Sequence, residues 1–323
     1  MKNVKNRYKK YKFGILLLVL VAFLCTGCSG REEEQMLHRQ NGINLMENGK
    51  YEKALEEFQL ALDLSLGEIG EKEVDICFYK AEAQYYLNDV EGAKNTYTAI
   101  INYNEDAKAY FLRGNLYYSL GDEGNALSDY EAAIENDKKD YDLYIGVYEA
   151  LLAHGKEGEA LSYLNHALEI GGNKAFDKMQ KGRIHFLLGE TEEAISLLEE
   201  AIKGKEKDAY FYLADVYEAI GEEEKAQENI NAYIEGKDVD SYKLFEVANA
   251  ELGRGNFDMA IQCLNQALEL KSVPNKQMIM KTLVIAYEHS RDFESAKKVM
   301  TEYIEAYPDD EEALREYTFL ETR

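Results

Sequence analysis

The stretch "GKYEKALEEFQLALDL", residues 49–64, predicts a turn that leads into a helix. Gly49 favours the end of a preceding helix, because glycine adopts a positive φ angle without steric cost. Apolar side chains then recur at helical spacing on one face, at Ala54, Phe58 and Ala61. The stretch therefore predicts an amphipathic helix whose apolar face packs against a neighbouring helix.

The same pattern recurs along the chain at intervals of 32 to 39 residues. A large side chain stands four residues after the alanine in most copies, as Phe58 does after Ala54. The alanines that match Ala54 in the later copies are Ala93, Ala126, Ala160, Ala194, Ala226, Ala260 and Ala296. A fixed period of about 34 residues indicates a protein built from stacked helical repeats.

A turn signal stands five residues before each of these alanines. The eight residues at that position are Gly49, Asn88, Gly121, Gly155, Gly189, Gly221, Gly255 and Arg291. Upstream of each turn lies another helical pattern, and in six copies it carries a small residue, at Gly42, Ala81, Gly114, Gly182, Ala214 and Ala248. Each copy is therefore predicted to form two antiparallel helices joined by a short turn.

These positions resemble the tetratricopeptide repeat over residues 35–308. The resemblance implies an all-α fold, a right-handed α-solenoid of about eight helix-turn-helix units that acts as a scaffold for binding. The family's usual first-helix tryptophan is replaced, for example by Tyr110, and its loop proline occurs only as Pro308. The longest interval predicts a five-residue insertion near "SLGEIGEKE", and residues 309–323 are predicted to form a C-terminal capping helix.

The N-terminal residues resemble a bacterial lipoprotein signal. A basic segment precedes twelve residues, 13–24, that are apolar apart from one glycine and too few to span a bilayer as a helix. "CTGC" then places small residues directly before Cys28, although Cys25 stands where the family usually has leucine. The resemblance implies a signal peptide at 1–27, lipidation of Cys28, and a short acidic tether at 28–34. The alternatives are an ordinary secretory signal and an uncleaved anchor.

The lipoprotein resemblance implies a location on the extracytoplasmic face of a bacterial cell membrane, and on the outer membrane if the organism is diderm. The chain has 37 basic and 61 acidic residues, and six of the basic residues lie in the predicted signal peptide. Such a surface repels phosphate backbones and anionic lipid headgroups. We therefore expect no nucleic-acid partner, and membrane attachment through the N-terminal lipid only.

Motifs that carry catalysis are missing from the sequence. It contains no HExxH, no GxSxG, no phosphate-binding P-loop and no GxGxxG, and its five histidines are scattered singly. We therefore expect no enzymatic activity, no cofactor and no metal site. Cys77 and Cys263 lie too many repeats apart to form a disulfide and are expected to be packing residues.

In this family, five positions of each first helix line the inner face of the solenoid, and here those positions are rich in aromatic residues. The candidate groove residues carried over in this way are Phe78, Tyr85, Phe111, Asn115, Tyr118, Phe176, Arg183, Phe186, Phe211 and Phe245. The alternative interpretation is that some of these rings pack between repeats and do not contact a ligand. Phe111 and Phe245 stand where the family's clamp for a peptide carboxylate has lysine, so such a clamp is not expected.

The aromatic and acidic groove predicts a protein or peptide partner that is neutral or basic and has exposed apolar residues. Aromatic rings interleaved with carboxylates also suit sugars. The alternative hypothesis is therefore a glycan-binding factor that assists polysaccharide or envelope assembly.

Overall fold

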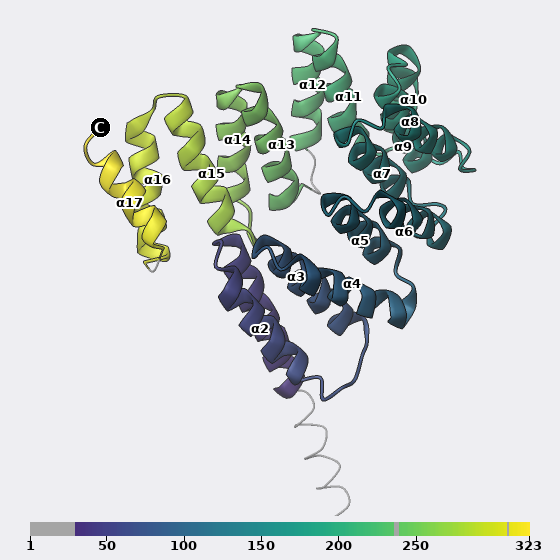
Figure 1. The fold of residues 1–323 in the computed structure, drawn as a ribbon. Coiled ribbons are helices and arrows are strands. Elements are labelled where there is room, and N and C mark those ends of the chain that lie inside the picture. Colours follow the sequence, from purple (N-terminus) through teal and green to yellow (C-terminus); the bar gives the residue numbers. More distant parts are fainter. Residues whose placement is uncertain (1–29, 236–238, 309) are drawn as a thin grey trace, which may run out of the picture. The chain divides into compact units, whose positions relative to one another are not determined.

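The computed structural model describes residues 30–235, 239–308 and 310–323. Over these ranges the regular secondary structure is helical and no strand occurs (Figure 1). A first helix covers residues 30–47. It is followed by α2 (Tyr51–Asp63), α3 (Glu71–Tyr86), α4 (Val90–Asn104), α5 (Ala107–Ser119), α6 (Glu123–Asn136), α7 (Tyr141–Ala153), α8 (Glu157–Leu168), α9 (Ala175–Leu187), α10 (Thr191–Lys203), α11 (Ala209–Ala219), α12 (Glu223–Ile234), α13 (Ser241–Arg254), α14 (Phe257–Leu268), α15 (Lys276–His289), α16 (Phe293–Ala306) and α17 (Glu311–Leu320).

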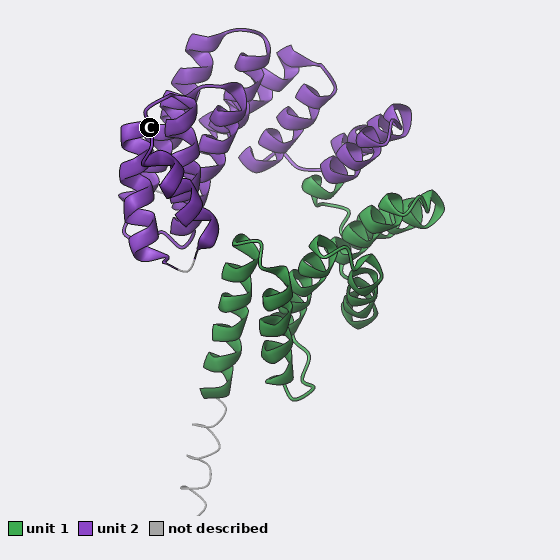
Figure 2. Cartoon of the chain, turned by 60° about the vertical axis from the view of Figure 1, so that its left-hand side comes forward, with its two compact units in different colours: residues 1–143 green, residues 144–323 purple. Residues whose placement is uncertain are grey.

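The order of helices confirms the predicted α-solenoid of eight helix-turn-helix units followed by a capping helix. The chain divides into two compact units, residues 1–143 and 144–323, and the boundary falls inside α7 (Figure 2). Each unit is described by itself below.

The repeated alanines are the centres of helix packing. All eight are buried, and so are the residues four and seven positions after each of them, such as Phe58 and Ala61. The small residues of the first helices face these large side chains. A Cβ atom added to Gly114 would lie 2.7 Å from the Tyr130 ring, and one added to Gly182 would lie 2.8 Å from Leu198. The alignment of repeats therefore describes the actual packing register.

The turn position has a positive φ angle in all eight units, between 62° and 81°. Six of these residues are glycines, and Asn88 and Arg291 adopt the same left-handed conformation. The turn geometry is thus kept even where the sequence offers no glycine.

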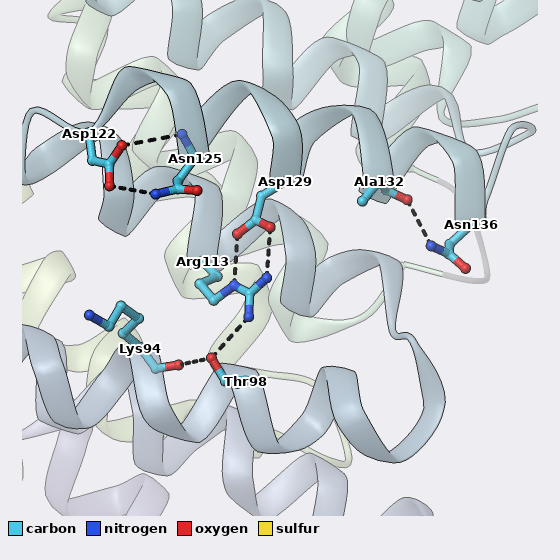
Figure 3. A network of polar contacts seen from close by, with 8 residues as sticks. All are labelled: Lys94, Thr98, Arg113, Asp122, Asn125, Asp129, Ala132 and Asn136. Atoms are coloured by element: carbon cyan, nitrogen blue, oxygen red, sulfur yellow. Dashed lines mark hydrogen bonds and ion pairs between the residues drawn. The ribbon is translucent and has the colours of Figure 1, made fainter.

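A polar network ties the second and third repeats together in the first unit (Figure 3). Arg113 on α5 donates to both carboxylate oxygens of Asp129 on α6, at 2.8 and 2.7 Å. It also donates to the Thr98 hydroxyl on α4 at 3.0 Å, and that hydroxyl donates to the Lys94 carbonyl at 2.8 Å. Asp129 is buried. One guanidinium therefore connects three consecutive helices.

The start of the solenoid differs from the predicted tether at 28–34, because residues 30–34 already belong to the first helix. Contacts with later elements hold this end of the helix. Glu32 pairs with Lys72, and the Gln35 amide donates to the Ala61 carbonyl at 3.1 Å. The tether prediction is therefore wrong for residues 30–34. Cys28 and the predicted signal peptide lie outside the described residues.

The capping helix α17 is fixed at its first turn by Asp310. This carboxylate accepts hydrogen bonds from the backbone N–H groups of Glu312 and Ala313, both at 3.2 Å. It also accepts the Tyr303 hydroxyl proton at 2.7 Å and pairs with Lys281 at 2.7 Å. The Lys281 and Tyr303 contacts, together with the N-cap bond, hold the pKa of Asp310 at about 2 against the opposing effect of burial.

Candidate binding surface

A cavity of about 400 Å³ opens in the first unit, between α3, α4 and α5. It is mainly apolar, with tyrosine rings at its mouth and three polar side chains in its wall. Its lining residues are Phe78, Glu82, Tyr85, Tyr86, Tyr97, Lys108, Leu112, Asn115 and Leu116. A concave apolar site with a few polar groups is the usual form of a ligand-binding site.

Helical spacing places these residues on facing surfaces. Phe78, Glu82 and Tyr85 follow one another at intervals of four and three residues along α3, so they share one face. Lys108 and Leu112 do the same on α5. The Tyr97 ring of α4 lies deeper and is 5% exposed, whereas Tyr85 is 47% exposed. The cavity therefore has a packed floor and an accessible aromatic rim.

The charges at this cavity are nearly balanced, in contrast to the acidic chain. The Lys108 ammonium lies 5.0 Å from the centre of the Phe78 ring, a cation–π contact. Burial raises the pKa of Glu82, and the positive charge of Lys108 opposes that shift. Asn115 is held in the wall because its amide oxygen accepts the Tyr130 hydroxyl proton at 2.6 Å. An entering group would meet one acid, one base and one amide among rings.

Three of the ten residues predicted for the groove meet at this cavity, namely Phe78, Tyr85 and Asn115. Phe111 is half-buried, with its ring 5.8 Å from that of Tyr130. Tyr118 is 7% exposed because it stacks on Tyr130, with ring centres 6.0 Å apart. Its place in the prediction is corrected, since a buried ring presents no face to a ligand.

In the second unit, the predicted groove residues take three different environments. Phe176 is 48% exposed, while Phe186 and Phe245 pack against the cores around α10 and α14. Phe211 is 9% exposed and contacts the Tyr233 ring at 5.6 Å between centres, so it also belongs to the core and its prediction is corrected. Only part of the predicted surface is therefore available at these positions.

Arg183, the last of the predicted groove residues, interacts within its own unit. Its guanidinium lies 4.3 Å from the centre of the Tyr212 ring and donates to the Gln180 side chain at 2.6 Å. Nearby first helices carry ion pairs, Lys243 with Asp208 and Arg254 with Asp215. Charged groups on this part of the solenoid thus satisfy one another.

Six of the nine residues that line the cavity are not among the ten predicted groove residues, namely Glu82, Tyr86, Tyr97, Lys108, Leu112 and Leu116. Tyr97 occupies the repeated packing position after Ala93, which predicts a core residue, and it is indeed buried. Leu112 and Leu116 follow Lys108 at helical spacing, so extending that face by two turns would have found them.

Neither a metal site nor a membrane span is found in residues 30–235, 239–308 and 310–323. In these ranges no three His, Cys, Asp or Glu side chains come together in an arrangement that could hold a metal ion. Among the helices in the same ranges, none has the length and apolar character that a membrane span requires.

Comparison with known proteins finds relatives along the repeats. Superkiller complex protein 3 of Homo sapiens is 30% identical over 161 residues, which is 49% of this chain and 10% of that protein. DnaJ protein P58IPK homolog B of Oryza sativa subsp. japonica is 30% identical over 155 residues, 43% of this chain and 33% of that protein. The chain thus spans a third or less of the length of these relatives.

The solved structure of yeast Tom70 matches 90% of this chain and 64% of its own chain, with a TM-score of 0.54 and 18% identity, a likeness of fold. The family model for the tetratricopeptide repeat matches residues 79–142, 179–238 and 246–311, more than half of the chain. Taken with the register of eight helical hairpins, this match shows that the chain belongs to the tetratricopeptide repeat family.

Proposed function

We propose that this protein is a non-catalytic scaffold that binds a protein or peptide partner in the cavity of its first unit. The tetratricopeptide fold implies protein partners. The observation that carries the proposal is the 400 Å³ cavity with Tyr85 and Tyr86 at its mouth, 47% and 53% exposed. Tyrosine combines a large apolar face with a polar tip, which is why it is enriched at protein interfaces.

The lining of the cavity suggests the chemistry of the partner. Its apolar walls suit a large apolar side chain, and Glu82, Lys108 and Asn115 offer polar contacts to the backbone or flanks of that segment. The surrounding chain is strongly acidic, with a formal charge of −24, so neutral or basic flanks are favoured electrostatically. The same charge disfavours nucleic acid.

We also propose that the scaffold is anchored by lipid on Cys28, on the extracytoplasmic face of a bacterial cell membrane. In a diderm organism this would be the outer membrane. The support is the sequence, in which a basic segment, an apolar core and "CTGC" follow one another. Replacing Cys28 by Ser should abolish incorporation of labelled fatty acid and leave unprocessed precursor. Labelling that persists in Cys28→Ser would reject this anchor.

The cavity is tested by Tyr85→Ala, with Leu120→Ala as the matched control. Both side chains are exposed, at 47% and 53%, in the first unit, but only Tyr85 lines the cavity. Membranes are crosslinked, the scaffold is purified from them, and the proteins captured with it are quantified by mass spectrometry. A protein captured by the wild type and by Leu120→Ala should be lost with Tyr85→Ala. Equal capture by all three, with unchanged circular dichroism, would place the binding surface elsewhere.

The alternative is a glycan-binding factor for polysaccharide or envelope assembly. Its specific support is that the aromatic rim shares one cavity with the Glu82 carboxylate and the Asn115 amide, groups that suit sugar hydroxyls. Treating the membranes with protease or with glycan-digesting enzymes before capture separates the two functions. Loss of the Tyr85-dependent signal after glycan digestion alone would favour the glycan.

A further inference from the structure

The inserted loop between α2 and α3, residues 64–70, exposes two large apolar side chains. Leu66 is 71% exposed and Ile69 is 61% exposed, the highest values among the large apolar side chains in the part of the chain that the structure describes. Leu66 has a φ angle of 55°, a left-handed conformation that is uncommon for a residue with a side chain. The loop therefore presents apolar groups to its surroundings from an unusual backbone.

Hydrogen bonds on both sides hold this loop in one conformation. The Ser65 hydroxyl donates to the Leu62 carbonyl at 2.7 Å, and the Gly70 N–H donates to the Glu73 carboxylate at 2.9 Å. From α4, the Tyr103 hydroxyl donates to the Ile69 carbonyl at 3.0 Å. The exposure of Leu66 and Ile69 is thus built into a supported loop.

The loop lies beside the start of the described chain (Figure 1). Ile69 and Leu64 line a hollow of about 330 Å³ together with Arg31 and Gln35 from the first turns of the first helix. The Gln35 amide donates to the Ala61 carbonyl at the end of α2 and to the Glu73 carboxylate at 2.8 Å. The N-terminal end of the first helix and the loop therefore form one end of the first unit.

The distance to the predicted lipid is short. Gly30, the first described residue, follows Cys28 by two residues, which span at most about 7 Å even when fully extended. A lipid on Cys28 would therefore bring this end of the unit, with Leu66 and Ile69, to the surface of the bilayer. An apolar group that is exposed next to a membrane is stabilised when it leaves water for the headgroup boundary.

We propose that the loop 64–70 is a membrane-contact surface whose Leu66 and Ile69 side chains enter the headgroup boundary of the bilayer that holds the Cys28 lipid. This inference rests on the lipid anchor of the proposed function. The lipid surface is favoured over a protein occupant because the loop and the anchor belong to the same end of the unit.

The basic side chains near the loop are accompanied by acidic ones. Arg31 and Lys72 are offset at the same hollow by Glu32, Glu68 and Glu73. The contact therefore does not depend on anionic headgroups. The acyl chains supply the affinity, since a diacylated cysteine is already a stable anchor, and the loop fixes which end of the scaffold faces the membrane.

The test places a fluorophore on Leu66→Cys in the full, lipidated chain, with Leu120→Cys as the control. Leu120 is 53% exposed and lies in the turn after α5. Cys77→Ser is used as the background, and Cys263 is fully buried, so the label goes to the introduced thiol. The protein is reconstituted in vesicles of phosphatidylethanolamine and phosphatidylglycerol, and quenching by nitroxide lipid and by aqueous iodide is measured.

We expect nitroxide lipid to quench the label at residue 66 severalfold more than the label at residue 120, with the opposite order for iodide. Adding Ile69→Asp should reduce lipid quenching at residue 66 to the control value, because a carboxylate resists entry into the bilayer.

The possible outcomes test the membrane contact of the loop and the lipid anchor separately. A lipidated chain that floats with the vesicles but keeps residue 66 open to iodide would overturn this inference and leave the anchor intact. A label shielded from both quenchers would mean that protein covers the loop, which also overturns it. A wild-type chain that takes up no lipid and does not float would reject the anchor, and the loop contact with it.

Discussion

The first helices of the two units use their inner positions in different ways. On α3 and α5, Phe78, Tyr85 and Lys108 surround an open cavity, and the Lys108 ammonium contacts a ring. On α11 and α13, similar positions carry charges that pair between helices, as Arg254 does with Asp215. The same helical scaffold thus lines an apolar cavity in one unit, whereas in the other the hollow of about 340 Å³ between α11, α12 and α13 is lined mainly by polar side chains.

The contrast extends to how deeply the ion pairs between helices are buried. In the first unit the pair is internal, because the side chains of Arg113 and Asp129 are only 15% and 8% exposed. In the second unit the pairs near α11 and α13 are more exposed, at 23% and 29% for Arg254 and Asp215 and at 35% and 40% for Lys243 and Asp208. Burial still raises the pKa of Asp215, which Arg254 opposes. Because Arg113 and Asp129 pair inside the packing, their charges do not occupy the α3–α5 surface of the first unit. That surface stays available for a partner.

The largest effect is expected for Asp129→Ala, which should leave the Arg113 guanidinium buried without its carboxylate. Breaking a buried pair in this way costs about 3 kcal/mol or more in the free energy of unfolding. Chemical denaturation measures the loss, and hydrogen exchange should locate it in α4 to α6. Asp129→Asn, which keeps the shape and one acceptor, should lose less. A loss below about 1 kcal/mol would show that the network is not what stabilises the first unit.

A smaller loss is expected for Arg254→Ala in the second unit. It removes the cationic partner of Asp215 and of Glu251, which is 5% exposed and keeps only the Asn256 amide as a side-chain donor, and a buried group that loses a charged partner in this way costs about 1–3 kcal/mol. Lys243→Ala is the control, because its more exposed pair should contribute less than about 1 kcal/mol. If both variants lose the same free energy of unfolding, the difference in burial does not decide the strength of these pairs.

A pH effect is expected where like charges meet in the second unit. Burial and a hydrogen bond to Glu316 raise the pKa of Glu288 from its usual 4.5 to about 7. The contribution to stability is therefore fully present below pH 4.5 and is lost as the pH rises through about 7. Because the group is only half-buried and solvent screens its charge, the change should stay below about 1 kcal/mol.

Glu288→Gln tests this effect, since the amide resembles the protonated acid. The variant should be more stable than the wild type above neutral pH and should lose the dependence between acidic and neutral pH. Thermal unfolding across that pH range measures both, with Glu294→Gln on α16 as the control. If Glu288→Gln keeps the pH profile of the wild type, the pair of Glu288 and Glu316 does not cause the pH dependence of stability.

The smallest effect on stability is expected for Tyr85→Ala, within about 0.5 kcal/mol, because nearly half of that side chain is already exposed. Tyr130→Ala provides the contrast, since Tyr130 is fully buried and its loss should cost about 3 kcal/mol. Denaturation curves for the two variants check this difference. A large loss with Tyr85→Ala would mean that the cavity rim holds the fold together.

Much of the fold could be predicted because its signals are local and repeated. The repeated alanine of each copy, such as Ala194, indicates that another helix packs closely against it. The turn residue indicates a positive φ angle. The exposure of groove residues depends on neighbours that the repeat does not specify. Tyr85 and Tyr118 occupy similar positions, but Tyr118 stacks on Tyr130 and is buried. The shape of the cavity also depends on how the side chains of Leu112 and Tyr97 pack in three dimensions.

The beginning of the first helix could not be predicted for a similar reason. The lipoprotein resemblance implied a short acidic tether at 28–34, whereas the structure extends the helix to residue 30. The decisive contacts come from Lys72 and the Ala61 carbonyl, far along the sequence. Long-range partners of this kind are not visible in a local pattern.

The network around Arg113 has a consequence for how the chain acquires its structure. Its bonds to Asp129 and Thr98 span only 16 and 15 residues, and the Ser241–Asn275 bond in the second unit spans 34. Contacts so close in sequence give a low contact order, which favours rapid folding. All bonds of this network lie within the first unit, so these repeats can acquire it while the ribosome is still synthesising the later ones.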